Sequence, residues 1–240
     1  MATMMLLSTR GLSRHFGGLK AVENIDFDLP EGQVRALIGP NGAGKTTYVG
    51  LLSGRIPASA GSVTFDGQNI THLPAHQRIR AGMAYTFQIT SIYSRLSVQE
   101  NVALALRWRT GSNEIATMKR ASDALERVGI AERADQLAGD LSYGHQRLLE
   151  IAMGISQQPR LLILDEPTQG LADNEIVDFI SLIRGLAGEM TVLLIEHNIH
   201  VVMQTADAIT VLNGGEILAE GTPGEIRENA AVQAAYLGTG

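Results

Sequence analysis

Short apolar runs alternate with mixed segments in the last third of the chain. Three of these runs are continuous, which is typical of strands that a parallel sheet buries on both faces. The runs are Leu161–Leu164, Thr191–Ile195 and Ala208–Leu212. The intervening segments, about Asp173–Ala187 and Ile199–Ala206, suit crossover helices. This alternation predicts an α/β fold with a mostly parallel core sheet.

The first third of the chain has the patterns of strands and turns. Residues Ile25–Leu29 alternate apolar and polar side chains, as a half-buried strand does. The mostly apolar run Val34–Ile38 predicts a buried strand, and Gly61–Phe65 predicts a strand that ends at the tight turn Asp66–Gly67. We therefore expect an antiparallel β part near the start of the chain.

The middle of the chain, from about Ser97 to Ala138, has helical periodicity instead. Apolar side chains recur at helical spacing on both sides of Gly111–Asn113, which is expected to break the segment in two. These positions are Val98, Val102, Leu106, Ala121, Leu125 and Val128. We predict one domain over residues 1–240, with a core formed by 1–96 and 140–240 and an inserted helical subdomain at 97–139.

Composition narrows the classes of protein that fit. The chain has 240 residues, 45% of them hydrophobic, which is enough to bury a substantial core. The net charge of −6 disfavours binding to a nucleic-acid backbone, and the lack of cysteine excludes disulfides and thiolate metal sites. The start of the chain does not have the pattern of a secretory signal. No apolar run approaches the roughly 18 residues that span a bilayer, so we expect any membrane role to depend on a partner.

The segment after Val34–Ile38 matches the phosphate-loop pattern G-x-x-x-x-G-K-[ST] at every position. It consists of Gly39, Pro40, Asn41, Gly42, Ala43, Gly44, Lys45 and Thr46. The glycines let backbone N–H groups surround a phosphate, and the N-terminus of the following helix adds positive charge. Lys45 is expected to contact the β- and γ-phosphates, and the Thr46 hydroxyl to bind Mg²⁺. The alternative, a glycine turn beside a lysine, does not account for the flanking strand and helix.

Two adjacent carboxylates, Asp165 and Glu166, follow the apolar run Leu161–Leu164. Open α/β sheets bind their ligands at the carboxyl ends of their strands. Asp165 is therefore a candidate Mg²⁺ ligand together with Thr46, and Glu166 is a candidate general base for an attacking water. The alternative is an acidic turn after a strand, which the complete phosphate loop makes the weaker explanation.

The segment Leu141–Arg147 begins another predicted helix. Ser142 is a suitable N-cap, and Gly144 allows close approach of the backbone. The segment resembles the signature L-S-G-G-Q of the ATP-binding cassette (ABC) ATPases, with Tyr143 in place of a glycine and His145 in place of glutamine. Taken alone, it is equally an ordinary N-capped helix.

The resemblance to ABC ATPases extends over nearly the whole chain, because further motifs follow in the order of that family. It implies that Phe16 stacks on adenine and that Thr47 continues the ATP contacts of the phosphate loop. It also implies that Gln88 joins the helical subdomain to the nucleotide site and that His197 meets the γ-phosphate. The implied catalytic residues are Lys45, Gln88, Glu166 and His197, and the implied Mg²⁺ ligands are Thr46, Gln88 and Asp165.

In this family, two cassettes bind ATP between them in a head-to-tail arrangement. The resemblance therefore implies that Ser142 and Gly144 contact the ATP of the opposite subunit, and that Asp173 contacts that subunit. It also implies hydrolysis of ATP to ADP and phosphate, with Mg²⁺ as the metal. A heterodimer of two different cassettes is the favoured form.

Within the family, the chain is most similar to the ATP-binding subunits of bacterial branched-chain amino-acid importers. The segments that carry this likeness are Phe16–Val22, Gly39–Thr47, Tyr85–Gln88, Leu141–Glu150, Glu220–Pro223 and Ala235–Gly238. The likeness implies two transmembrane permease subunits as partners and, indirectly, a periplasmic or extracellular solute-binding protein. It implies a peripheral position on the cytoplasmic face of the bacterial inner membrane and no nucleic-acid partner.

Several alternatives stay open at this stage. Related importers carry urea, short amides or aromatic acids, and other cassettes serve export or lipid transport. A soluble ABC ATPase acting on DNA or ribosomes fits less well, because the long coiled coil or second cassette of those proteins is absent from this sequence. In the transport alternatives, a helix of the permease would dock near Gln88, with Ile92, Tyr93 and Leu96 as candidate contacts. Packing within the helical subdomain is the alternative role of these three side chains.

Overall fold

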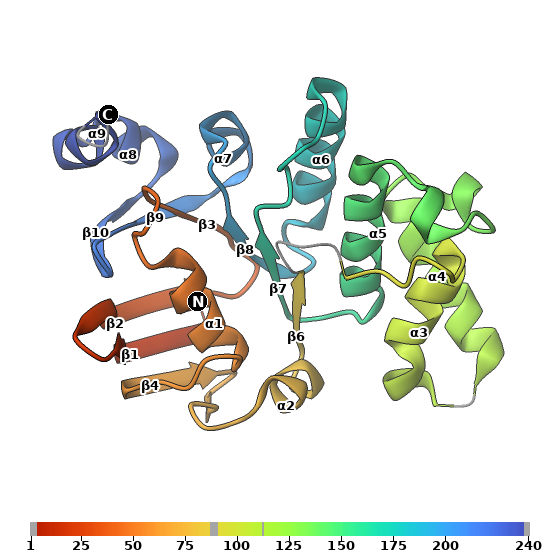
Figure 1. Ribbon diagram of the computed structural model, residues 1–240, viewed down its shortest axis with the longest axis horizontal. Helices are drawn as coiled ribbons and strands as arrows, with labels where there is room; N and C mark the ends of the chain where they lie inside the picture. The colour runs from red at the N-terminus through yellow and green to blue at the C-terminus, as the bar shows by residue number, and fades with distance from the viewer. Residues whose placement is uncertain (1–3, 87–90, 112, 238–240) are drawn as a thin grey trace.

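The computed structural model of the protein describes residues 4–86, 91–111 and 113–237, and its strands form two sheets (Figure 1). The first sheet has four strands in the order β2-β1-β4-β5, and all of its pairings are antiparallel. Its strands are β1 (Met5–Phe16), β2 (Leu19–Pro30), β4 (Ala60–Phe65) and β5 (Gln68–Asn69). The predicted antiparallel part is therefore present, and it is larger than expected because β1 was not predicted.

The second sheet has six strands in the order β10-β9-β3-β8-β7-β6. Its strands are β3 (Val34–Ile38), β6 (Met83–Thr86), β7 (Leu161–Asp165), β8 (Thr191–Ile195), β9 (Ala208–Asn213) and β10 (Glu216–Gly221). All pairings are parallel except that of β10 with β9. Every residue of β3, β7 and β8 is buried, which explains why their sequences are mostly apolar and do not alternate between apolar and polar residues. The α/β fold with a mostly parallel core sheet is confirmed.

Helices cover this sheet and extend to one side of it (Figure 1). Those outside the middle segment are α1 (Lys45–Ser53), α2 (Ala75–Arg80), α5 (Tyr143–Ser156), α6 (Asp173–Leu186), α7 (Ile199–Thr205), α8 (Pro223–Glu228) and α9 (Ala230–Leu237). The crossover helices α6 and α7 lie within one residue of their predicted bounds. Ile226 of α8 and Val232 of α9 pack in one cluster with Ile38 at the end of β3, so the last two helices cover the sheet beside the phosphate loop.

The middle segment forms α3 (Val98–Thr110) and α4 (Glu114–Arg127), followed by short 3-10 turns at Ala131–Arg133 and Ala138–Asp140. Ser97 and Glu100 form a capping box at the start of α3, and the Asn113 side chain caps α4. The predicted break is therefore present, since α3 ends at Thr110 and α4 begins at Glu114. Both helices pack against α5 (Tyr143–Ser156), which lies between them and the parallel sheet (Figure 1).

None of the described helices is long and apolar enough to cross a membrane.

Candidate functional site

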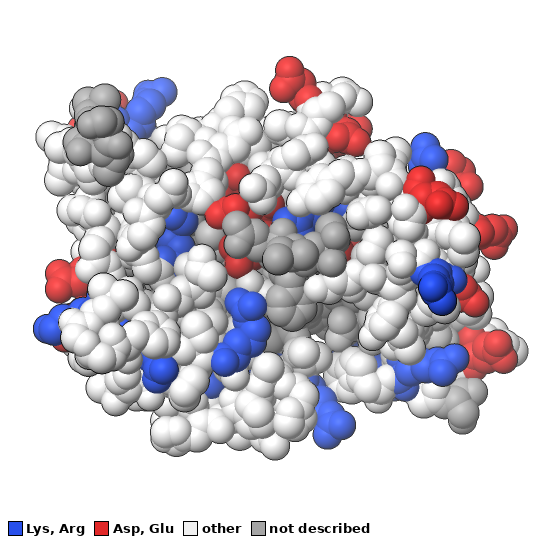
Figure 2. Space-filling view, viewed as in Figure 1, with Lys and Arg blue, Asp and Glu red and all other residues white. Residues whose placement is uncertain are grey.

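Three loops that follow parallel strands meet at one edge of the core sheet. The strand register pairs Leu37 of β3 with Ile195 of β8, and Ile195 with Asp165 of β7. The phosphate loop, the Asp165–Glu166 pair and His197 therefore leave the sheet side by side. In the view of Figure 2, acidic side chains gather near the middle of the visible surface, with basic side chains on both sides.

The phosphate loop requires glycine at two positions where the backbone passes close to other strands. Gly39 and Gly44 both have positive φ, 154° and 98°. A Cβ atom on Gly39 would collide with the carbonyl oxygen of Leu212, and one on Gly44 with that of Ala21. The loop is thus held between β2 and β9 in a shape that a larger residue would disrupt.

Lys45 is buried at the start of α1, with only 6% of its surface exposed. Its ammonium group donates hydrogen bonds to the carbonyl oxygens of Gly39 (2.6 Å) and Pro40 (3.1 Å). Burial lowers the pKa of Lys45, and the nearby Glu166 and Asp165 carboxylates act in the opposite direction. Thr46, the next residue, is exposed in the first turn of α1.

Asp165 ends β7 as a buried carboxylate with a tyrosine partner that the sequence did not indicate. Its Oδ2 accepts a hydrogen bond of 2.6 Å from the Tyr85 hydroxyl, which in turn accepts one of 2.7 Å from Arg55. The Arg55 guanidinium also stacks on the Tyr85 ring, 4.3 Å from its centroid. Burial raises the pKa of Asp165, and the Tyr85 hydrogen bond partly opposes that shift.

Glu166 and His197 are in direct contact. Oε1 of Glu166 lies 2.7 Å from Nε2 of His197. Glu166 adopts a left-handed backbone conformation with φ of 49°, and its N–H donates to the carbonyl of Ile195 (2.9 Å). A non-glycine residue held in this conformation is typical of functional sites. The structure thus places the predicted general base beside the predicted γ-phosphate histidine.

The signature segment lies at the N-terminus of α5. The Ser142 hydroxyl caps that helix and lies 2.7 Å from Nδ1 of His145. Gly144 is buried so close to Glu175 of α6 that a Cβ atom would collide with its carboxylate. The ring of Tyr143 lies against Gly170, where an added Cβ would be 2.9 Å from the ring. Glycine at positions 144 and 170 therefore allows the signature segment and the start of α6 to pack together.

The structure also contains a buried ion pair that sequence reasoning missed. Arg147 and Glu150, one turn apart on α5, are joined by a 2.8 Å contact, and both side chains are almost fully buried. Glu150 also accepts a hydrogen bond from the Ser91 N–H (2.5 Å), and Arg147 donates to the Glu166 carbonyl (3.5 Å). Burial raises the pKa of Glu150, whereas Arg147 and the Ser91 N–H lower it. The pair links the signature helix to the backbone of Glu166.

Three further predicted residues lie on β1, α1 and α6, and a fourth falls outside the described residues. Phe16 is exposed at the end of β1, where the Arg14 guanidinium stacks on its ring at 4.4 Å. Asp173 is exposed at the first position of α6, and Thr47 is half-buried in α1. Gln88 falls outside the described residues.

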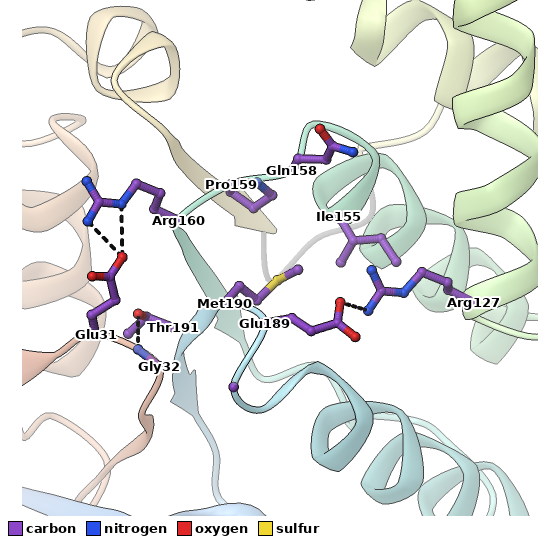
Figure 3. A pocket seen from close by; sticks show the side chains of 11 residues that line it. Glu31, Gly32, Arg127, Ile155, Gln158, Pro159, Arg160, Glu189, Met190 and Thr191 are labelled. Carbon is purple, nitrogen blue, oxygen red and sulfur yellow. Dashed lines mark hydrogen bonds and ion pairs between the residues drawn. The ribbon is translucent and has the colours of Figure 1, made fainter.

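A cavity of about 410 Å³ lies at the opposite edge of the sheet, before the first residues of β7 and β8 (Figure 3). Its charged lining residues form ion pairs, Arg160 with Glu31 and Arg127 with Glu189, both at 2.7 Å. None of the predicted site residues lines this cavity, so it is separate from the nucleotide-binding edge.

Comparison with known proteins identifies the family of this chain. A family model described as ABC transporter matches residues 22–169. This chain belongs to the ABC transporter ATP-binding family. A second model, described as branched-chain amino acid ATP-binding cassette transporter, matches residues 216–240 of the cassette.

Relatives of this cassette match it along its whole length. The high-affinity branched-chain amino acid transport ATP-binding protein BraF of Pseudomonas aeruginosa is 41% identical, covering 97% of this chain and 98% of BraF. The lipopolysaccharide export system ATP-binding protein LptB of Escherichia coli is 32% identical, covering 98% of both chains. The solved structure of MJ1267, an ATP-binding cassette of an ABC transporter in its ADP conformation, superposes with a TM-score of 0.88 at 28% identity, covering 98% of this chain and all of MJ1267.

Proposed function

We propose that this protein is the ATP-hydrolysing subunit of a bacterial importer for branched-chain or other hydrophobic amino acids. Membership of the ABC transporter family supports ATP binding and hydrolysis. The likeness to BraF and the match of residues 216–240 to the branched-chain cassette model support the solute class. The observation that carries the ATP-hydrolysis part of the proposal is the contact between Glu166 and His197 beside the phosphate loop, at the edge where an α/β sheet binds its ligand.

In the proposed reaction, the phosphate loop and Lys45 bind the phosphates of ATP, and Phe16 stacks on the adenine. When ATP binds, Lys45 would give up its hydrogen bonds to the Gly39 and Pro40 carbonyls and donate to phosphate oxygens instead. Glu166 accepts a proton from the attacking water, and His197, within hydrogen-bond distance, fixes the orientation of the carboxylate. The left-handed backbone of Glu166 holds this carboxylate where a side chain on a regular strand would not point.

The donor groups at this edge fit Mg²⁺. Magnesium prefers oxygen ligands and is commonly held by one or two carboxylates together with substrate phosphates. Asp165 and the Thr46 hydroxyl supply such oxygens, and Gln88 is the further ligand that the family resemblance implies. Burial disfavours the charge on Asp165, so a cation would compensate that charge. When bound, the ion would neutralise charge on the transferring phosphate.

A second cassette would complete the site. The described contacts of Ser142 and Gly144 are with α5 and α6. The N-terminus of α5 is a half-site for an anion, and a second subunit arranged head to tail would bring it to the γ-phosphate of ATP. Asp173, exposed at the start of α6, would contact the same subunit. Two different cassettes, as in the importers that the sequence resembles, are the favoured assembly.

A groove beside the second half of α3 is the proposed docking site for a permease. It has a volume of about 380 Å³, and four exposed apolar side chains line it: Ile79, Tyr93, Leu104 and Trp108. Exposed apolar side chains gathered in one place are typical of a protein-protein contact. Of the three candidates from the sequence, Tyr93 lines this groove, Ile92 packs against the core, and Leu96 lines a different cavity beside Glu100.

The likeness to LptB supports a second candidate, an export cassette. It is the weaker one, because the identity is 32% against 41% for BraF. The two candidates differ in the proteins that accompany the cassette. An importer of the proposed type places this protein on the cytoplasmic face of the inner membrane, with two permease subunits and, outside, a solute-binding protein.

The experiment is a pull-down of the tagged chain from detergent-solubilised membranes of its own host, with identification of the co-purifying proteins. We expect two multi-span permeases and a second cassette. A double Tyr93→Glu, Trp108→Glu variant should lose the permeases, whereas Ile115→Glu, which changes a side chain that is 86% exposed on α4, should keep them. Recovery of export components would favour the second candidate, and recovery of ribosomes or DNA-processing factors would overturn both.

A further inference from the structure

Glu196 is a buried carboxylate that none of the motifs accounts for. It lies between the end of β8 and His197, with 3% of its surface exposed. Oε1 accepts two hydrogen bonds from Thr168, one from its N–H (2.9 Å) and one from its hydroxyl (2.6 Å). Oε2 accepts from the backbone N–H groups of His197 (3.0 Å) and Asn198 (3.1 Å). An ionised carboxylate has about four acceptor positions, and these four bonds use them.

These bonds connect the two loops that carry the catalytic pair. Thr168 lies two residues after Glu166, on the loop that follows β7, and His197 follows Glu196 on the loop after β8. The side chains of Glu166 and His197 meet at 2.7 Å. These contacts thus form a closed ring. It consists of the backbone from Glu166 to Thr168, the carboxylate of Glu196 and the side chain of His197. The Glu196 carboxylate in this ring is buried and all its acceptor positions are used. Because a satisfied buried polar group is rigid, it fixes the separation of the two loops.

We propose that Glu196 is a positioning residue, which holds Glu166 and His197 at the distance that ATP hydrolysis requires. The inference rests on the proposed ATPase function and adds a residue to it. Glu196 does not touch the reacting atoms. It acts through Thr168 on one side and through the backbone of His197 on the other, so its loss should affect turnover more than nucleotide binding.

The first test is Glu196→Gln, which keeps the shape of the side chain but replaces one acceptor oxygen with an NH₂ donor. That donor would face either Thr168 or the backbone N–H groups of His197 and Asn198. Because a backbone N–H cannot accept a hydrogen bond, at least one of these N–H groups loses its partner. We expect kcat to fall roughly 10- to 100-fold, the effect of a displacement of about 1 Å at a catalytic group. The KM for ATP should stay within about twofold, because the interactions that bind the ground state are unchanged.

Two controls separate positioning from general stability. Glu220 also accepts a 2.6 Å hydrogen bond from a buried threonine, Thr210, but lies on β10, away from the site. Glu220→Gln should keep the wild-type kcat at temperatures where both variants are folded. The double variant Glu196→Gln, His197→Ala should have nearly the same kcat as His197→Ala alone. If Glu196 had a merely structural role, the two losses of kcat would instead multiply.

Thr168 variants keep the proposal testable if Glu196→Gln does not fold. Thr168→Val removes the hydroxyl and should lower kcat. Thr168→Ser keeps the hydroxyl and should retain most of the wild-type kcat. Equal turnover in Thr168→Val and wild type, or wild-type turnover in a folded Glu196→Gln, would overturn the inference. If Glu166→Gln hydrolyses ATP as fast as the wild type does, that result would instead count against the proposed function itself.

Discussion

Oε1 of Glu166 lies 2.7 Å from Nε2 of His197, although 31 residues separate the two along the chain. Each residue follows its own strand, β7 or β8, and these strands are neighbours in the sheet. The imidazole is partly exposed and the carboxylate is mostly covered, with side-chain exposures of 42% and 15%. Solvent therefore reaches the pair from the histidine side, the side of the γ-phosphate contact proposed for His197.

This contact leads to a prediction for Glu166→Gln. The amide keeps the size of the side chain but is a poor proton acceptor, so hydrolysis should fall roughly 10²–10⁴-fold, the usual contribution of a general base. ATP affinity should be retained, because the phosphate loop and Lys45 are unchanged. Phosphate release and an equilibrium nucleotide titration measure the two effects. The exposed carboxylate Glu189 gives a matched control, Glu189→Gln, and near-normal turnover in Glu166→Gln would contradict the assignment.

Asp165→Asn should make the nucleotide-free protein more stable while removing activity. Burial raises the pKa of Asp165, so the folded state binds its proton more tightly than the unfolded state does. Ionised Asp165 therefore lowers the free energy of unfolding at every pH above that raised pKa. This loss of stability disappears as the pH falls toward the ordinary pKa of an aspartate. Hydrolysis should fall by at least about 10²-fold, since a bound metal ion contributes several kcal/mol to the barrier.

Urea denaturation across pH tests the stability part of this prediction. The free energy of unfolding of Asp165→Asn should exceed that of the wild type near pH 7, and the difference between the two should shrink at acidic pH. The exposed Asp178 provides the control Asp178→Asn, which should show no such gain. A variant that is less stable than wild type at pH 7 would show that the Tyr85 hydrogen bond outweighs the burial of the charge.

The sequence identified the strands that the structure buries completely and missed those that break the simple patterns. The bounds of Val34–Ile38 and Thr191–Ile195 were predicted correctly, because both faces of each strand are covered and the residues are mostly apolar. β1 was missed because its pairing with β2 shifts register between Thr9 and Leu12 and again before His15, which interrupts the alternation. β10 was missed because it is an edge strand with no fully buried residue.

The same contrast applies to the candidate site. Lys45, Asp165 and Glu166 belong to local motifs, so their place at the sheet edge was predicted from the strands that precede them. Tyr85 and Glu196 were not found, because their roles depend on partners that are 80 and 28 residues away in the chain. Only the order of the strands in the sheet brings these side chains together, and a local motif does not encode that order.

His145 should affect how the cassette pairs with a second subunit. Its Nδ1 lies 2.7 Å from the Ser142 hydroxyl, the group proposed to meet the ATP of the opposite subunit. His145→Ala should weaken ATP-dependent association by about three- to tenfold, the value of one hydrogen bond. His145→Gln, which restores the usual residue of the signature, should retain it. Sedimentation of these variants in the Glu166→Gln background measures the effect, and equal association in all of them would show that this contact has no role.

The phosphate-loop glycines should differ in how strongly they resist substitution. Gly44→Ala places a Cβ atom against the Ala21 carbonyl at a positive φ, so we expect a loss of about 1–3 kcal/mol in the free energy of unfolding. Gly42 has a positive φ but open space around it, so Gly42→Ala should cost about 1 kcal/mol.

Gly61→Ala is the matched control for this series. Gly61 has a φ of 83°, and an added Cβ would collide with the backbone of Gly11 in the antiparallel sheet, away from the phosphate loop. It should lose stability to a similar extent as Gly44→Ala but keep wild-type ATP affinity at temperatures where it is folded. Gly44→Ala should weaken ATP binding as well, because its backbone forms the start of α1. If both variants bind ATP like the wild type, the close packing at Gly44 serves the fold and not the phosphate site.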